Sequence, residues 1–462
     1  MRAIAGISSL ALLLLLAGSE AGAQVLKRRA FLGVQMQNLT DSTAQALRLK
    51  KGQGVQVMAV IPNSTAEKSK LQPQDVILQI NGHAIANVTE AVVRARELQT
   101  GEKLTLTIAR QGKERTVKGT VAPMPTEHAP AVDVLYDEAR IESGHVRTIL
   151  RKPKGKTKMP TIFYVQGFGC TTLDLLPEYD PQRQLINGLV DRGYAVFRME
   201  KPGMGDSKGT RPCAEISFEE ELAAFQAGYQ KLLSYDFVDR DNIILFGHSL
   251  GGNVVPLLAN GHPPRGLITY GSVGKPWHEY LQDVLRKQRL LLGADPLAVE
   301  KDMQTALPLL HELFVGKKSP EELARQNPVY AQMLRSHLDY DGKDRLFGRH
   351  YTFLQGLTQL NIAQAYKEAG AHTLAIYGEA DVAAIDPSGA QYLAEVVNRY
   401  HPGKATFHLL PRTDHGFLAF GTMQETLAIP DRQNLVKYGK AKFNPQLVEV
   451  IDAWIKEKIS RT

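Results

Sequence analysis

A serine between glycines is the residue of this chain best placed to act as a nucleophile. The pentapeptide GHSLG at 247–251 directly follows the apolar run 243–246, which predicts a buried strand. The apolar residues 253–259 then predict a buried helix. In the strand-to-helix turn called a nucleophile elbow, a side chain at either glycine position would collide with neighbouring backbone. The pattern therefore predicts that Ser249 is a catalytic nucleophile.

A serine hydroxyl becomes a strong nucleophile only when a base accepts its proton, and an acid must orient that base. Asp381 follows the predicted strand 374–377, and His415 follows the predicted strand 406–410. The order nucleophile, acid, histidine, with each residue after a strand, is typical of an α/β-hydrolase triad. We predict Asp381 as the acid and His415 as the base. The alternatives for the acid are Glu379 and Asp386.

The oxyanion of a tetrahedral intermediate requires preorganised hydrogen-bond donors, each of which can contribute about 100–1,000-fold to the rate. One predicted donor is the backbone N–H of Leu250, directly after the nucleophile. The other is expected from the loop QGFG at 166–169, after the third strand of this half of the chain. Phe168 is the predicted residue, with Gly167 as the alternative.

A sheet with helices on both faces is the scaffold that these residues require. From residue 132 onward, predicted strands alternate with predicted helices, which favours a mostly parallel α/β sheet. The interval between 270 and 374 is instead charged, helix-prone and nearly strandless, which favours a helical cap over the site at 275–371. The predicted strands are 132–136, 145–150, 161–165, 194–199, 243–246, 267–270, 374–377 and 406–410, and the predicted helices are 185–191, 218–233 and 445–459.

Three stretches of this half carry a family resemblance. They are 247–259 with the pattern G-H-S-x-G-G-x-x-x-P-L-L-A, 200–207 (EKPGMGDS) and 377–381 (YGEAD). On these residues the region 132–462 resembles the α/β-hydrolase superfamily, and within it bacterial esterases with this elbow. The resemblance implies a serine hydrolase and covers almost everything after residue 132 except the cap.

The first part of the chain predicts short strands, tight turns and one helix at 89–98. The motifs 31–34 (FLGV), 60–67 (VIPNSTAE) and 71–77 (LQPQDVI) make it similar to a PDZ domain of the kind attached to periplasmic serine proteases, here spanning 24–122. The resemblance implies that a peptide C-terminus is captured as an added strand. The backbone N–H groups that would hold its carboxylate belong to Leu32, Gly33 and Val34. A PDZ fold used only for internal packing is the alternative.

Two turn positions depart from the PDZ pattern. Ser69-Lys70 replaces the usual Ala-Gly, and Gln74 replaces a glycine that tolerates a positive φ. Both lie away from the groove, so they affect turn geometry more than binding. After this domain, the proline-rich segment 123–131 predicts a linker.

The N-terminus has the features of a secretory signal peptide at 1–23. Arg2 is followed by the apolar run 10–17 and by Ala21-x-Ala23, which predicts cleavage before Gln24. The apolar segment is short for a membrane span of about 20 residues, so a retained anchor is the less favoured interpretation. We therefore expect an exported protein, periplasmic or secreted, without a stable membrane anchor.

Export bears on the only two cysteines of the chain, Cys170 and Cys213. Both are predicted just beyond the carboxyl ends of consecutive strands. Because disulfides persist in oxidising compartments, we favour a disulfide between them. Such a bond could contribute about 3–5 kcal/mol of stability.

Composition narrows the classes of function. A chain of 462 residues predicts two or three domains, and its formal charge of +7 is modest for this size. The basic residues form small clusters typical of solvated surface, and no recognition-helix or RNA-binding signature indicates nucleic-acid binding. No dinucleotide or phosphate-binding loop and no paired metal-ligand motif is present, so neither a cofactor nor a metal is predicted.

Three functions are compatible with this pattern. The leading hypothesis is an esterase for small or medium carboxylic esters, with the cap shaping its pocket and the PDZ groove binding a peptide or protein C-terminus. The second is a serine peptidase or amidase to which the PDZ domain delivers peptides. The third is a catalytically inactive PDZ binding protein, which the joint presence of serine, acid, histidine and an oxyanion loop argues against.

Overall fold

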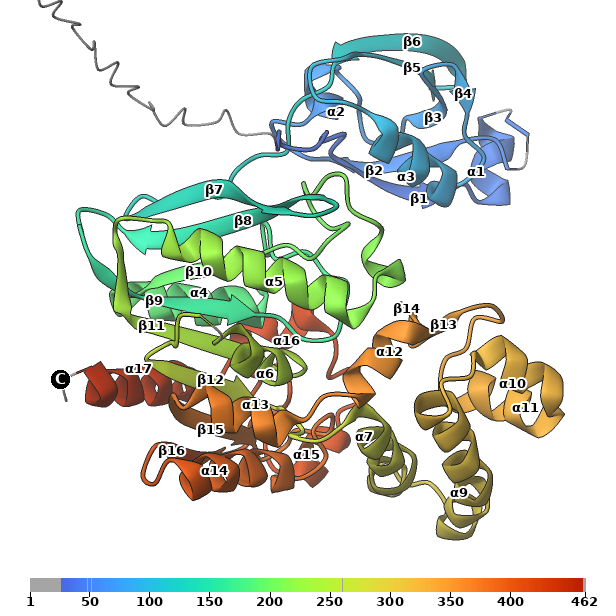
Figure 1. Ribbon diagram of the computed structural model, residues 1–462. Coiled ribbons are helices and arrows are strands. Elements are labelled where there is room, and N and C mark those ends of the chain that lie inside the picture. The colour runs from blue at the N-terminus through green and yellow to red at the C-terminus, as the bar shows by residue number, and fades with distance from the viewer. Residues whose placement is uncertain (1–25, 48, 51, 260, 460–462) are drawn as a thin grey trace, which may run out of the picture.

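The computed structural model describes residues 26–459 except 48, 51 and 260 (Figure 1). The signal peptide predicted at 1–23 lies outside the described residues. The chain forms a six-stranded antiparallel sheet in its first part and an eight-stranded mixed sheet in its second part. In the described range, no helix combines the length and the apolar character needed to cross a membrane.

The first sheet has the strand order β1-β2-β3-β5-β6, with β4 paired to β3. Alternate residues of its strands point into one core, in which Val57, Ile77 and Leu106 are fully buried. β1 lies at the edge, bonded to β2 on one side, and α3 lies beside it. The elements are β1 (Val34–Asn38), α1 (Asp41–Ala46), β2 (Val55–Val60), α2 (Thr65–Lys68), β3 (Val76–Ile80), β4 (His83–Ala84), α3 (Val88–Glu97), β5 (Lys103–Arg110) and β6 (Lys113–Thr120).

The two departures from the PDZ pattern keep the turn backbone that glycine would adopt. Lys70 has a φ of 60° and Gln74 a φ of 73°. A side chain in this left-handed region costs conformational energy that glycine avoids. The sequence therefore differs from the PDZ pattern at these two positions, but the backbone keeps the conformation that the pattern implies.

The second sheet has the order β16-β15-β12-β11-β9-β10-β8-β7. Neighbours from β10 to β16 pair in parallel, and β8 and β7 add antiparallel strands at one edge. The mostly parallel sheet predicted from the sequence is therefore present. The strands are β7 (Val132–Ile141), β8 (Gly144–Pro153), β9 (Met159–Val165), β10 (Ala195–Met199), β11 (Val238–His248), β12 (Gly266–Tyr270), β15 (His372–Gly378) and β16 (Ala405–Leu410).

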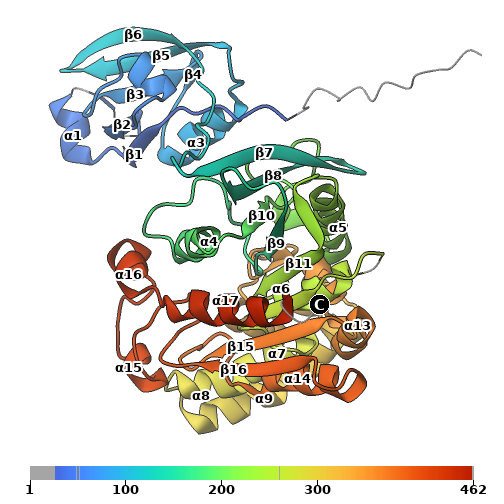
Figure 2. The ribbon, with the colours of Figure 1, turned by 90° about the vertical axis from the view of Figure 1, so that its left-hand side faces the viewer.

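Helices cover both faces of this sheet (Figure 2). In β9, Ile162 and Tyr164 point to one core and Phe163 and Val165 to the other, since successive side chains of a strand alternate. One face is covered by α4 (Pro181–Asp191) and α17 (Gln446–Ile459), and the other by α5 (Phe218–Leu233), α13 (Ile362–Ala369) and α14 (Ser388–Tyr400).

The segment between β12 and β15 holds the helices expected for a cap, at the carboxyl ends of the strands (Figure 1). Two of its helical stretches contain π-helical turns, at Val284–Gln288 and His311–Val315. The other elements are α7 (Trp277–Asp283), α8 (Arg289–Leu291), α9 (Pro296–Leu310), α10 (Pro320–Gln326), α11 (Pro328–His337), β13 (Arg345–Leu346), β14 (Arg349–His350) and α12 (Tyr351–Thr358).

The helix after the elbow is shorter than predicted. Residues 253–259 were expected to form one helix, but α6 spans only Gly251–Val254 and a 3₁₀ turn follows at Val255–Leu258. Pro256 has no N–H and its ring crowds the preceding turn, which disfavours an α-helix that continues through it.

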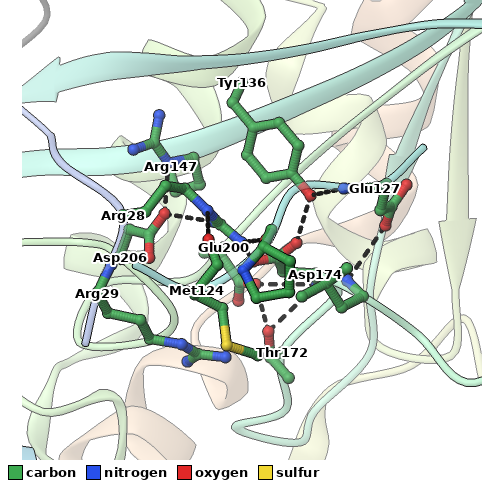
Figure 3. Close-up of polar contacts among 12 residues, drawn as sticks. Arg28, Arg29, Met124, Glu127, Tyr136, Arg147, Thr172, Asp174, Glu200 and Asp206 are labelled. Atoms are coloured by element: carbon green, nitrogen blue, oxygen red, sulfur yellow. Dashed lines mark hydrogen bonds and ion pairs between the residues drawn. The ribbon is translucent and has the colours of Figure 1, made fainter. Parts of the chain in front are cut away.

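The segment before β1 is fixed to the second sheet by Arg28, whose side chain is 12% exposed (Figure 3). The guanidinium of Arg28 lies 2.5 Å from Asp206 Oδ2 and 2.7 Å from Asp174 Oδ2. It also stacks 4.4 Å from the ring centre of Tyr136. Both aspartate side chains are almost fully buried, at 0% and 1% exposure, so Arg28 supplies a countercharge that water cannot.

The segment predicted as a linker also contacts the second sheet. Glu127 forms an ion pair with Arg198, and its Oε1 accepts a hydrogen bond of 3.1 Å from Leu175 N–H. Together with Arg28, these contacts hold both ends of the first domain. A proline-rich composition indicated a spacer, but charged side chains in it make specific contacts.

We expect Arg28→Met to lower the free energy of unfolding by about 3–5 kcal/mol, because it removes the cation paired with buried Asp174 and one of the two cations paired with buried Asp206, the other being Arg147. Chemical denaturation of the full chain measures this loss. Arg94→Met removes an arginine from the exposed pair with Glu97 and should change stability by less than about 1 kcal/mol. Equal stability of the Arg28 variant and the parent would contradict the assignment.

Candidate active site

Ser249 lies on a strained turn directly after β11. Its φ is 54°, and its N–H donates to Tyr270 O at 2.8 Å. A Cβ atom added at Gly247 would lie 2.3 Å from the carbonyl carbon of Gly251, and one added at Gly251 would lie 2.2 Å from Val165 O. Real side chains do not approach backbone so closely, so both glycines are required for this turn. The backbone has the geometry of a nucleophile elbow.

His415 and Asp381 meet at the carboxyl ends of neighbouring strands. Asp381 follows β15, His415 follows β16, and the distance from His415 Nδ1 to Asp381 Oδ2 is 2.8 Å. Asp381 is fully buried, and its other oxygen accepts a hydrogen bond of 2.8 Å from Ala384 N–H. The carboxylate is therefore fixed in orientation and directed at the imidazole.

Gly271 is a site residue that sequence reasoning missed. A Cβ atom there would lie 2.6 Å from Asp381 Oδ2 and 2.7 Å from His415 Nδ1. Any side chain at this position would separate the acid from the base. The available signal was a glycine directly after a core strand, β12, at the edge of the sheet where the other site residues lie.

The alternative acids have other partners. Glu379 Oε2 accepts a hydrogen bond of 2.7 Å from Arg412 N–H. Asp386 lies 3.1 Å from Lys287 Nζ and accepts a hydrogen bond of 3.0 Å from Ser388 N–H. In the described part of the chain, neither carboxylate contacts His415. Of the three candidates, the structure brings Asp381 to the histidine.

Two polar neighbours support the loop of His415. His248 Nε2 donates to His415 O at 2.9 Å, and burial lowers the pKa of His248 to about 3, so its ring is neutral. Asp414 accepts hydrogen bonds from the N–H groups of Gly416 and Leu418, at 2.8 and 2.9 Å. Burial raises the pKa of Asp414 to about 6. Both residues brace the loop: the His248 ring lies 4.9 Å from the His415 ring, centre to centre, and its hydrogen bond goes to the backbone of His415 and not to the imidazole.

The charge of Asp381 controls the titration of His415. Burial lowers the pKa of His415, but the negative charge and the hydrogen bond of Asp381 outweigh that effect, with a further contribution from Asp414. The net result is a pKa above the ordinary histidine value. Ser249 Oγ makes no hydrogen bond with His415 among the described residues, and such bonds often form only when substrate is present.

We expect kcat/KM for a neutral ester to rise with pH through a single limb whose midpoint lies above about 6.5, the ordinary histidine pKa. The sign follows because a general base must be unprotonated, and a raised pKa moves its loss of the proton to higher pH. A pH–rate profile measures the midpoint. A midpoint below the ordinary value would contradict the pairing of His415 with an ionised Asp381.

The predicted oxyanion donors lie at the same cavity as Ser249 and His415. Both Phe168 and Leu250 line it, and within the described residues neither of their N–H groups donates to a protein acceptor. A Cβ atom at Gly167 would lie 2.9 Å from Ser249 Cβ, so a glycine allows this loop to approach the nucleophile. Two unpaired N–H groups beside a serine are the arrangement that an oxyanion requires.

The cavity has a volume of about 280 Å³ and a mainly apolar wall. Six of its fourteen lining residues come from the predicted cap, so the cap contributes to the pocket as expected, although the individual residues were not predicted. Phe168 stacks on Trp277 with ring centres 5.3 Å apart. The apolar lining residues from the cap are Trp277, Tyr280, Leu281, Val284 and Phe347.

Cys170 and Cys213 form a disulfide. It connects the loop that carries Phe168 with the 3₁₀ turn Cys213–Glu215. The bond therefore fixes the far end of the predicted oxyanion loop. No cluster of three or more histidine, cysteine, aspartate or glutamate side chains suited to a metal occurs in the described residues.

Comparisons with known families match both parts of the chain. Residues 30–121 match the PDZ domain family. Residues 179–419, more than half of the chain, match the family described as serine aminopeptidase, S33.

Curated relatives that are similar to part of the chain include periplasmic serine proteases. A probable periplasmic serine endoprotease DegP-like from Marinomonas sp. (strain MWYL1) is 31% identical over 113 residues, which are 24% of this chain and 24% of the relative. A probable periplasmic serine protease do/HhoA-like from Haemophilus influenzae is 34% identical over 91 residues, 20% of each chain. The chain thus spans a quarter or less of the length of these relatives.

Solved structures similar to the chain include Est1E from Butyrivibrio proteoclasticus, at 15% identity and a TM-score of 0.43 over 71% of this chain and 99% of that one. An HtrA-type protease, AlgWS227A with decapeptide, is similar at 28% identity and a TM-score of 0.21 over 22% of this chain and 31% of that one.

Proposed function

We propose that this chain, which belongs to the serine aminopeptidase S33 family, is an exported esterase that cleaves carboxylic esters through Ser249, His415 and Asp381. The family makes it a serine hydrolase, and the proposal concerns the bond cleaved and the residues that cleave it. The observation that carries the choice of an ester is the lining of the cavity next to Ser249.

An aminopeptidase has to bind the α-ammonium group of its substrate, and a buried ammonium needs a negative partner. The cavity beside Ser249 has no aspartate or glutamate in its lining, as far as the described residues go. Its cap wall is aromatic and aliphatic, with Trp277, Tyr280 and Phe347 among its members, except for the uncharged amide of Gln288. This lining favours an uncharged apolar group on the substrate over a free amino terminus.

In the proposed reaction, Ser249 Oγ attacks the ester carbonyl carbon while the ring of His415 accepts its proton. The tetrahedral oxyanion accepts hydrogen bonds from the N–H groups of Leu250 and Phe168. The bond to the alcohol then breaks, and His415 returns the proton to the leaving oxygen. Water attacks the acyl-enzyme by the same steps in reverse and releases the acid. Asp381 stabilises the imidazolium throughout.

A peptidase function draws on the family description and on the PDZ domain, and it uses the same residues. It additionally requires His415 to protonate an amine leaving group. The two functions place different demands on the cavity. The free amino terminus of a peptide would need a negatively charged partner in the lining, and an apolar ester would not. The cavity lining therefore favours the ester.

For the first domain we propose capture of a peptide C-terminus. The N–H groups of Leu32 and Gly33 donate to no protein acceptor within the described residues, and β1 is an edge strand open to strand addition. Gly33 has a φ of 70°, and a Cβ atom there would lie 2.1 Å from Ser64 Cβ. Val34 completes the proposed carboxylate loop. Export is supported by the periplasmic relatives of this domain.

A parallel substrate panel tests the esterase. Aryl esters with aliphatic and aromatic acyl groups, aminoacyl anilides and short peptides are compared by kcat/KM, with a fluorophosphonate probe counting active sites. We expect kcat/KM for the apolar esters to exceed that for the aminoacyl anilides by at least about 100-fold. Burying an ammonium group without a negative partner costs a few kcal/mol, which corresponds to a factor of this size. Faster cleavage of the anilides or peptides would overturn the esterase in favour of a peptidase.

A further inference from the structure

The predicted oxyanion loop contacts a buried cluster of charged side chains that has no role in the proposed reaction. Lys201, Glu221 and Arg349 have side-chain exposures of 0%, 2% and 2%. Lys201 follows β10, Glu221 belongs to α5, and Arg349 belongs to β14 of the cap. Three separate parts of the fold therefore bring charged side chains to one place, although burying a charge is costly.

The two cations of the cluster bind the backbone of the oxyanion loop. Lys201 Nζ lies 2.7 Å from Gly167 O, 3.4 Å from Phe168 O and 2.9 Å from Glu221 Oε1. An ammonium has three N–H donors, and these three oxygens surround it. Arg349 donates to Phe168 O at 3.0 Å and to Glu221 Oε2 at 2.9 Å.

The bond from Lys201 acts on the peptide that carries the predicted donor. Gly167 O and Phe168 N–H belong to the same planar peptide unit, and in a trans unit they point in opposite directions. An ammonium that holds the carbonyl on one side therefore directs the N–H to the other side, where Ser249 and the cavity lie. It also withdraws electron density from the peptide, which strengthens the N–H as a donor.

Arg349 adds a second constraint from the cap. Its guanidinium lies 3.6 Å from the ring centre of Phe353, which fixes its plane. Burial lowers the pKa of Lys201, Glu221 raises it and Arg349 lowers it further. With Lys201 protonated, the cluster holds two positive charges and one negative charge behind the loop. A fixed positive charge close to a developing oxyanion stabilises the transition state more than the neutral ester.

We propose that Lys201 and Arg349 are positioning residues for the oxyanion hole: they hold and polarise the loop peptides so that Phe168 N–H meets the tetrahedral intermediate. The inference rests on the proposed ester hydrolysis. It also gives the cap a role in catalysis besides shaping the pocket, because Arg349 reaches the loop from the cap.

The test compares Lys201→Met and Arg349→Met with the parent in the full chain. Each variant leaves Glu221 one cationic partner, so no unpaired carboxylate is created. We expect kcat for an aryl ester to fall ~10- to ~50-fold in Lys201→Met, less than the ~100- to ~1,000-fold loss of a whole donor, with KM within ~2-fold. The kcat of Arg349→Met should fall less. Arg349 binds Phe168 O, which belongs to the next peptide unit and not to the unit that carries Phe168 N–H.

An aryl trifluoromethyl ketone supplies the readout that a merely structural role would not change. It adds to the serine as a tetrahedral oxyanion, so its inhibition constant should rise by the same factor as kcat falls. The matching methyl ketone, which remains a ground-state ligand, should bind equally to all forms. Lys152→Met is the control, since it removes an ammonium 2.8 Å from Asp133 in the edge hairpin.

The outcomes separate this inference from the proposed function. If the parent hydrolyses esters and the folded variants keep both kcat and inhibitor affinity, the positioning role is overturned. If KM rises as much as kcat falls, or if the affinities for both ketones decrease by the same factor, the cluster only shapes the pocket and the inference is wrong. If Lys201→Met yields no folded protein, Arg349→Met alone decides by the same two readings. A parent that hydrolyses no ester overturns the proposed function itself.

Discussion

Ser249→Ala is expected to reduce hydrolysis of an activated aryl ester by about 10⁶-fold, because without the hydroxyl no acyl-enzyme can form and only oxyanion binding and substrate positioning remain. The fold should be retained, since alanine and serine have the same Cβ and the strained φ of 54° is imposed by the flanking glycines. Initial rates give the loss in kcat, and thermal unfolding gives the stability.

Labelling by a fluorophosphonate probe provides a second reading of the same variant. The parent should be labelled in proportion to its active sites, and Ser249→Ala should not be labelled. Ser336→Ala is the matched control, because this serine lies exposed on the cap, where its hydroxyl donates to Gln332 O at 2.8 Å. Labelling or turnover that survives in Ser249→Ala would remove this residue as the nucleophile.

Much of the hydrolase half could be predicted because its signals are local. Most of the parallel strands are short and largely apolar, and the carboxyl ends of such strands meet at one edge of the sheet. Residues that follow those runs, such as Ser249 and His415, therefore lie close together although 166 residues of chain separate them. The resemblances to a PDZ domain and to α/β-hydrolases are confirmed by the family matches over 30–121 and 179–419.

The charged clusters could not be predicted in this way. Arg28 lies 178 residues from its partner Asp206, and Arg349 lies 128 residues from Glu221. Charged residues have no hydrophobic periodicity that would mark them as buried, and the small basic cluster that contains Arg28 was assigned to solvated surface. The π-helical turns of the cap and the 3₁₀ turn at Pro256 were missed for a related reason, since tertiary packing decides such local departures from an α-helix.

Asp381→Asn is expected to lower kcat for the same ester by about 10⁴-fold while the site keeps its geometry. The reason lies in the two oxygens of the carboxylate. Oδ1 accepts a hydrogen bond from Ala384 N–H at 2.8 Å, and only an oxygen can keep this bond. The new amide must therefore turn its NH₂ group to the position of Oδ2, which faces His415 Nδ1 at 2.8 Å.

An NH₂ group at that position can only donate, so the ring nitrogen facing it must be the unprotonated one. The proton then resides on the other nitrogen, and the imidazole cannot accept a proton from Ser249. Rates at a pH well above the histidine pKa measure this effect free of simple protonation. Glu379→Gln and Asp386→Asn are the matched controls and should retain near-parent rates, because their carboxylates bond to Arg412 N–H and to Lys287 instead of the imidazole. A parent-like rate in Asp381→Asn with a large loss in either control would move the acid to that residue.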